Sequence, residues 1–170
     1  MDLYMVVLRL IHIFAGIFWV GNVWYLVLFF LPRVKRFGPE TGRIMQTMSA
    51  QPFPMSMTIA AVSVALSGIL MYGNVSKGFS REWILTPTGI VLGIAGVLGI
   101  LAVLEGFIVS RPAAERMAQL GRQAAAPGGP PNPAAMQEMQ ALSAKLERGV
   151  YRTAYVVGLI VVGMAIARYL

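Results

Sequence analysis

The stretch that decides the fold is LRLIHIFAGIFWVGNVWYLVLFF (Leu8–Phe30), an apolar run that contains the only histidine of the chain, His12. A run of about 20 apolar residues is long enough to cross the hydrocarbon core of a bilayer. Of the 170 residues, 57% are hydrophobic and 12% are charged, whereas soluble domains carry about 25% charged residues. We therefore predict an all-α integral membrane protein.

Four apolar stretches are long enough to span a membrane, and prolines such as Pro32 and Pro112 mark their ends. The stretches cover about residues 3–31, 55–72, 85–110 and 150–169. Residues 1–170 then form a single membrane domain, a bundle of four transmembrane helices. The start of the chain has no basic segment and no small-residue cleavage site, so we expect the first helix to be a retained span and not a signal peptide.

Lysine and arginine are distributed unevenly among the connections. The first and third connections hold ten of them and the second holds two: Arg33, Lys35, Arg36, Arg43, Arg111, Arg116, Arg122, Lys145, Arg148 and Arg152, against Lys77 and Arg81. The positive-inside rule therefore predicts that residues 33–53 and about 111–149 are cytoplasmic, with both termini outside the cytoplasm of an inner (plasma) membrane. The net charge of +7 favours contact with anionic headgroups of the lipid bilayer and not with nucleic acid.

The third connection contains an amphipathic segment. Asn132 can cap a helix that begins at Pro133 and continues into the fourth span. Apolar residues recur along this segment at helical spacing: Met136, Met139, Leu142 and Leu146. The apolar stripe either lies on the headgroups and the cytoplasmic end of the bundle, or provides a docking face for another subunit.

Ionisable residues within the membrane are costly and are candidates for function. Three qualify, namely Arg9, His12 and Glu105. Helix rise places His12 and Glu105 at different depths, so we do not expect them to form an acid–base pair. We expect Glu105 to be a packing residue satisfied by neighbours. Its candidate neighbours are Trp19, Asn22, Tyr155, Arg111 and Arg152.

His12 has two interpretations. It can be hydrogen-bonded across a helix interface to Ser63 or Ser67 of the second span. It can instead be an axial ligand to a haem iron or to the magnesium of a chlorin, with Met71 or Met164 as a second ligand for iron.

Small residues near His12 leave both interpretations open. Gly16 and Trp19 follow His12 on one helix face, so a planar ring, or another helix, can fill the gap at Gly16. The third span has a similar small-residue face, which favours close helix packing. It consists of Gly89, Gly93, Gly96 and Gly99.

The segment LRLIHIFAGIFWVGNVWY, with a histidine followed seven residues later by Trp-x-Gly, resembles the first helix of small four-helix membrane proteins related to CopD-type copper-resistance proteins and HemJ-type protoporphyrinogen oxidases. The resemblance covers the first helix and, elsewhere, only the layout. It implies a metal-binding or haem-binding role for His12. The third span has no lysine, although HemJ-type proteins use one there.

The sequence contains no phosphate-binding loop, nucleophile elbow or histidine–carboxylate pair at metal-ligand spacing, and it has no cysteine. We therefore expect a non-catalytic accessory or structural subunit of a larger, bioenergetic membrane complex, associated with other membrane subunits or with itself. The alternatives are a haem-binding redox protein or oxidase that uses His12, and a protein that transports copper or another metal.

Overall fold

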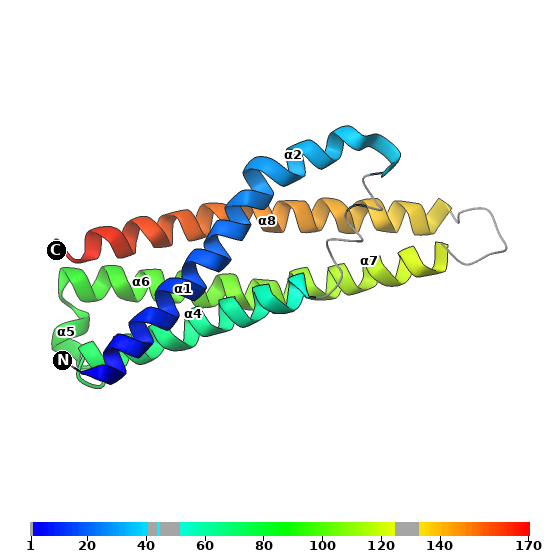
Figure 1. Cartoon of the computed structure of the whole chain (residues 1–170). Helices are drawn as coiled ribbons and strands as arrows, with labels where there is room; N and C mark the ends of the chain where they lie inside the picture. The colour runs from blue at the N-terminus through cyan, green and yellow to red at the C-terminus, as the bar shows by residue number, and fades with distance from the viewer. Residues whose placement is uncertain (1, 41–43, 45–51, 125–132) are drawn as a thin grey trace.

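The computed structural model describes residues 2–40, 44, 52–124 and 133–170. Within these residues, four helices are long and apolar enough to cross a membrane, which confirms the predicted all-α bundle. The main elements are α1 (Leu3–Tyr25), α2 (Leu31–Val34), α4 (Phe53–Val75), α5 (Arg81–Ile84), α6 (Pro87–Glu105), α7 (Arg111–Ala124) and α8 (Pro133–Ala167). Two antiparallel hairpins lie side by side, because α1 packs mainly against α4 and α6 mainly against α8 (Figure 1).

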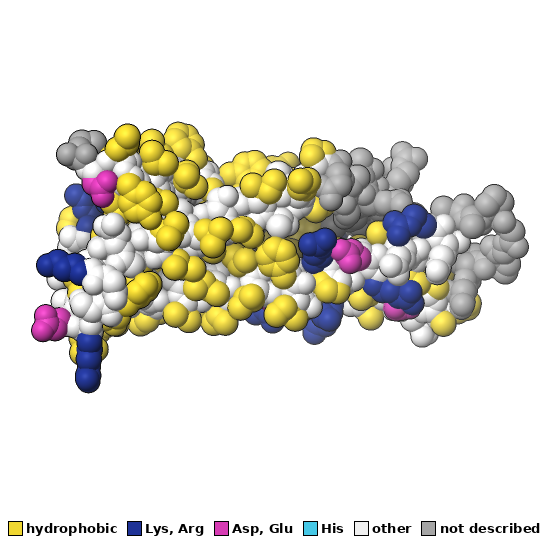
Figure 2. Space-filling view, turned by 90° about the horizontal axis from the view of Figure 1, so that it is seen from below, with side chains coloured by type: hydrophobic (Ala, Val, Ile, Leu, Met, Phe, Trp, Pro, Cys, Tyr) yellow, Lys and Arg dark blue, Asp and Glu magenta, His cyan; other side chains and the backbone are white. Residues whose placement is uncertain are grey.

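Small side chains let α1, α4 and α8 approach closely in the core. The buried cluster contains Trp19, Val23, Ala60, Ala61, Ala154 and Val157. The Trp24 indole N–H donates a hydrogen bond of 3.2 Å to the Ala154 carbonyl, which ties α1 to α8. Large apolar side chains such as Phe14 and Ile17 are instead exposed, and the middle of the molecule is covered by hydrophobic side chains (Figure 2). This outer surface fits the lipid of a bilayer.

Two of the predicted helix ends are wrong, because the helices continue through Pro32 and Pro112. The first helix is helical from Leu3 to Phe37 and the third from Pro87 to Gln123. A proline has no N–H and its ring clashes with the carbonyl four residues earlier. In both helices a π-turn precedes the proline and widens the helix at that place.

The two π-turns have the same register. They span Leu26–Phe30 and Gly106–Ser110, and each is followed by one residue and then the proline. The Leu31 N–H donates to the Leu26 carbonyl, and the Arg111 N–H donates to the Gly106 carbonyl, so both hydrogen bonds reach back five residues.

The third helix begins at Pro87. The Thr86 hydroxyl caps this end by accepting a hydrogen bond of 3.0 Å from the Gly89 N–H.

Helix α7 and residues 133–148 of α8 form an arm that extends beyond the apolar part of the bundle (Figure 1). As predicted, the amphipathic segment continues without a break into the fourth span, although Asn132 lies outside the described residues. Sequence reasoning missed α7, which packs against α8 and buries Ala113 and Leu120. The Arg116 guanidinium donates two hydrogen bonds, of 2.7 and 3.0 Å, to the Glu138 carboxylate.

Part of the apolar stripe of the amphipathic segment is half-buried and part of it is exposed. Met139, Leu142 and Leu146 are half-buried, whereas Met136 is exposed. Packing of α7 on α8 thus accounts for part of the stripe without another subunit.

Candidate functional site

His12 lies on α1 and faces α4. Its Nδ1 atom is 3.0 Å from the Val64 carbonyl oxygen and 3.1 Å from the Ser67 hydroxyl. The Ser67 hydroxyl donates its own proton to the Ser63 carbonyl at 2.5 Å. Because the Val64 carbonyl can only accept, Nδ1 carries the proton and donates it to α4.

Proton placement on Nδ1 leaves a lone pair on Nε2 when the imidazole is neutral, and the cost of a charge within the bilayer favours the neutral form. No hydrogen bond to a described residue involves Nε2, and every enclosed side-chain nitrogen or oxygen of the described part has a partner. Nε2 therefore reaches the surface of the chain. Metal-binding histidines are commonly held in this way, with the other ring nitrogen donating to a backbone carbonyl.

Gly68 makes room for the imidazole. A Cβ atom at this position would lie 3.0 Å from His12 Cε1 and 3.4 Å from Nδ1, so a larger residue would push the ring away from the Val64 carbonyl. Sequence reasoning missed Gly68 and Val64, because a contact made through a backbone carbonyl leaves no trace in residue type.

Gly16 and Trp19 both take part in helix packing. A Cβ atom at Gly16 would lie 3.9 Å from a Val64 methyl group, and Trp19 is buried in the core cluster. Gly16 therefore packs against α4 and Trp19 packs in the core. Neither residue leaves open space for a planar ring between the helices.

The two candidate methionine ligands lie on different hairpins. Met71 is half-buried on α4, four residues after Ser67, and so lies one turn along the face that holds His12. Met164 is half-buried on α8 next to Gly163, whose nearest side chains are Val91 and Ala95 of α6. Only Met71 is on the helix that binds the imidazole.

The other polar residues of α1 do not join the contacts of His12. Arg9, one turn before His12, is exposed and takes no part in the ion pairs among the described residues. The Asn22 amide donates to the Phe18 carbonyl of its own helix at 2.7 Å.

Glu105 forms a separate polar contact at the junction of α6, α7 and α8. Its carboxylate accepts from Arg152 at 2.7 Å and from the Ser110 hydroxyl at 3.2 Å. The side chain is 16% exposed, whereas that of Arg152 is 63% exposed. A Cβ atom at Gly149 would lie 3.1 Å from a carboxylate oxygen of Glu105, so glycine allows α8 to approach there.

Of the neighbours expected for Glu105, only Arg152 is its partner among the described residues. Arg111 pairs with Glu115 at 2.9 Å, Tyr155 is exposed, and Trp19 lies in the core cluster. Sequence reasoning missed Ser110, because the π-turn brings a residue five positions away into reach of the carboxylate.

The small-residue face of the third span is used mostly within the chain. Gly89 lies against the backbone of Trp83 and Ile84, Gly93 against the Tyr72 hydroxyl and Gly99 near Ile160. Only Gly96 has open space beside it. The Tyr72 hydroxyl also donates to the Gly89 carbonyl at 2.9 Å, so this face holds α4 and α6 together.

No protein-family model, curated protein or solved structure matches the chain. The resemblance of the first helix to CopD-type and HemJ-type proteins therefore stays a prediction.

Proposed function

We propose that the protein is a small membrane subunit in which the Nε2 atom of His12 would hold a haem or a chlorin. The observation that carries the proposal is the hydrogen bond from Nδ1 to the Val64 carbonyl, which leaves the Nε2 lone pair available at the surface of the chain. A haem bound there would carry single electrons on its iron.

The residues of this chain fit such a role in part. The imidazole is oriented by Val64 and Ser67 and given room by Gly68. Gly16 and Trp19 are occupied by packing, so a tetrapyrrole would lie on the outer surface of α1 and α4 or at an interface with a second subunit. Of the two candidate methionines, Met71 is on the helix that binds the imidazole and Met164 is not.

Visible absorption of the purified protein, produced with haem supplied, tests this proposal. We expect a Soret band that is lost in His12→Ala and in Gly68→Val, because valine would displace the imidazole. Gly21→Val is the matched control, since nothing lies within 4 Å of a Cβ atom there. Circular dichroism reports whether each variant remains helical. A colourless native protein that is fully helical, or colour retained in His12→Ala, would refute the proposal.

An accessory subunit without a cofactor is the second candidate. It is favoured by the packing roles of Gly16, Trp19 and Glu105, which need no ligand. Under this candidate the native protein is colourless, and mild solubilisation retains other membrane subunits with it. Among the described residues, no group of potential metal ligands favours copper transport, the third expectation.

We infer further that the basic end of the bundle, which includes the arm, faces the cytoplasm. Gln140 on the arm and Glu82 at the opposite end are exposed, and the chain has no cysteine of its own. In intact cells, an impermeant thiol reagent should label Glu82→Cys and not Gln140→Cys. The reverse result would overturn the orientation.

A further inference from the structure

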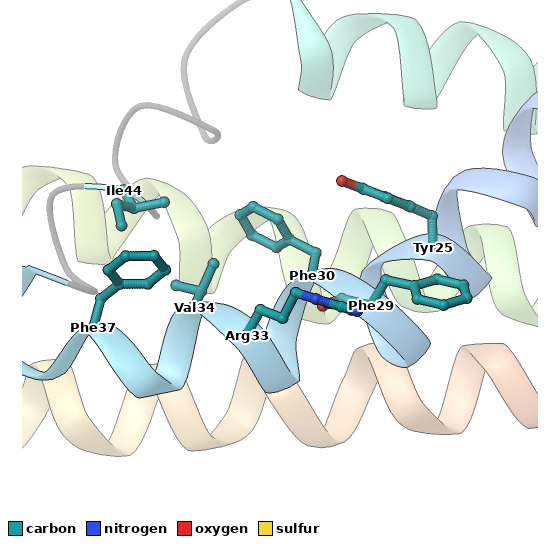
Figure 3. A pocket seen from close by; sticks show the side chains of 7 residues that line it. All are labelled: Tyr25, Phe29, Phe30, Arg33, Val34, Phe37 and Ile44. Atoms are coloured by element: carbon teal, nitrogen blue, oxygen red, sulfur yellow. The ribbon is translucent and has the colours of Figure 1, made fainter.

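The first π-turn builds an open groove of about 530 Å³ near the basic end of α1. Its wall consists of Tyr25, Phe29, Phe30, Arg33, Val34, Phe37 and Ile44 (Figure 3). In a π-turn, residues four and five positions further on lie to either side of the residue one turn earlier. The ring centroids of Phe29 and Phe30 accordingly lie 6.3 and 6.5 Å from that of Tyr25. An ordinary helical turn would place Phe30 on a different side of the helix from Tyr25.

Among the described residues that line this groove, Arg33 is the only one with a charged side chain. Its Nη1 atom donates to the Phe29 carbonyl at 3.1 Å, and its guanidinium lies 5.6 Å from the centre of the Phe29 ring. These contacts hold the cation at the groove and use only part of its hydrogen-bonding capacity, since a guanidinium has five N–H donors.

Four carboxylates at this end of the molecule are already paired. Among the side chains that the structure describes, Glu105, Glu115, Glu138 and Glu147 form ion pairs with Arg152, Arg111, Arg116 and Lys35 respectively. Arg33 takes part in none of these pairs. No ion pair among the described side chains therefore neutralises Arg33.

We propose that the groove binds a phospholipid with an anionic headgroup. The phosphate contacts Arg33, and one acyl chain lies along Tyr25, Phe30 and Phe37. The position of the groove supports this occupant, because it joins the exposed apolar surface of α1 to the basic end of the bundle, where headgroups and acyl chains meet. Guanidinium groups match the geometry of phosphate oxygens with two parallel hydrogen bonds.

Native mass spectrometry of the full chain can measure the lipids retained from micelles that contain equal amounts of phosphatidylglycerol and phosphatidylcholine. We expect the native protein to prefer phosphatidylglycerol, and Arg33→Gln to lower that preference about fivefold. Arg36→Gln is the matched control, because Arg36 is exposed on the same segment and does not line the groove. Phe30→Ala tests the proposed contact with the acyl chain without changing the charge. It should reduce retention of both lipids.

Circular dichroism confirms that each variant is folded before its lipids are compared. Equal losses in Arg33→Gln and Arg36→Gln would mean diffuse attraction to basic residues and would overturn the proposal, as would a native protein without a preference. Inorganic phosphate alone should not raise the unfolding temperature. If it stabilises the protein as much as phosphatidylglycerol does, the site is an anion site and the proposed acyl contact is wrong.

Discussion

The two π-turns have the same cause, but one faces the outside of the bundle and the other faces a neighbouring helix. Each precedes a residue–proline pair, and each lets a transmembrane helix continue beyond its apolar part. At and after the first turn, Phe29 and Arg33 are exposed, whereas Val34 is buried and Lys35 pairs with Glu147 of α8. After the second, α7 stays beside α8 (Figure 1). There the Glu105 carboxylate accepts hydrogen bonds from Ser110 and Arg152. The proline explains the turn, whereas the residues around it decide whether the turn faces lipid or another helix.

The largest expected effect comes from filling the close approach at the second turn. Gly149→Leu places a side chain where even a Cβ atom lies 3.1 Å from the Glu105 carboxylate and 3.4 Å from the Ser110 hydroxyl. Overpacking should lower the free energy of unfolding by about 1–3 kcal/mol. Gly106→Leu is the control, because nothing lies within 4 Å of a Cβ atom there. Thermal unfolding in detergent would compare them, and equal losses would show that α8 is not closely packed at Gly149.

Replacing the prolines tests whether the two turns are independent. In Pro32→Ala and Pro112→Ala, the restored N–H allows an ordinary helical turn, which moves residues in the preceding segment around the helix. We expect Pro32→Ala to lower phosphatidylglycerol retention about as much as Arg33→Gln, roughly fivefold. Pro112→Ala should leave retention unchanged. Similar lipid retention in Pro32→Ala and the native protein would contradict the link between the turn and the groove.

Glu105→Gln should have a smaller effect. The amide keeps the size of the side chain and can still accept from Ser110 and Arg152, but it loses the charge. Because Arg152 is 63% exposed, we expect a loss of at most about 1 kcal/mol in the free energy of unfolding, with assembly and function retained. Unfolding temperature and copurification of partner subunits would check this. A selective loss of activity with intact assembly would instead indicate proton transfer.

The smallest expected effect concerns pH and the arm that follows the second turn. Hydrogen bonds from the Arg116 guanidinium lower the pKa of the Glu138 carboxyl below its ordinary value of 4.5. A carboxyl with a lowered pKa in the folded state stabilises the fold above its ordinary pKa, and this contribution is lost as pH falls through the folded-state value. The protection of α7 amides from hydrogen exchange, relative to their intrinsic rate at each pH, should therefore decrease below about pH 4.5. Glu138→Gln should remove this pH dependence, and a response that persists in this variant would assign it to another group.

Much of the fold follows from residue type, because four apolar runs in a chain without enough charge for a soluble domain leave few alternatives. The passage of the helices through Pro32 and Pro112 could not be predicted in this way. Proline usually ends a helix, and its accommodation depends on a π-turn whose formation involves five residues of mostly ordinary type. Helix α7 was within reach, since Ala113, Met117 and Leu120 recur at helical spacing.

The candidate site was predictable only in outline. His12 and Ser67 are polar residues in apolar runs, and their partnership was among the expectations. The position of the proton on the imidazole depends on the backbone carbonyl of Val64, and every residue has such a carbonyl. The ring also needs the space at Gly68, which in sequence looks like any other glycine of a helix. Glu105 was identified for the same reason as His12, but its contact with Ser110 required knowledge of the π-turn.

Helix α8 gives the molecule a mechanical property. Its 35 residues, about 52 Å at 1.5 Å per residue, run from the arm through the core without an internal proline. Such a rod has no hinge, so a torque applied to its basic end travels along its axis to Ala154 and Val157. There the rod touches α1 through the Trp24 indole. A load on the arm is thus transmitted across the thickness of the membrane by one covalent element, which also contacts α1, the helix that carries His12.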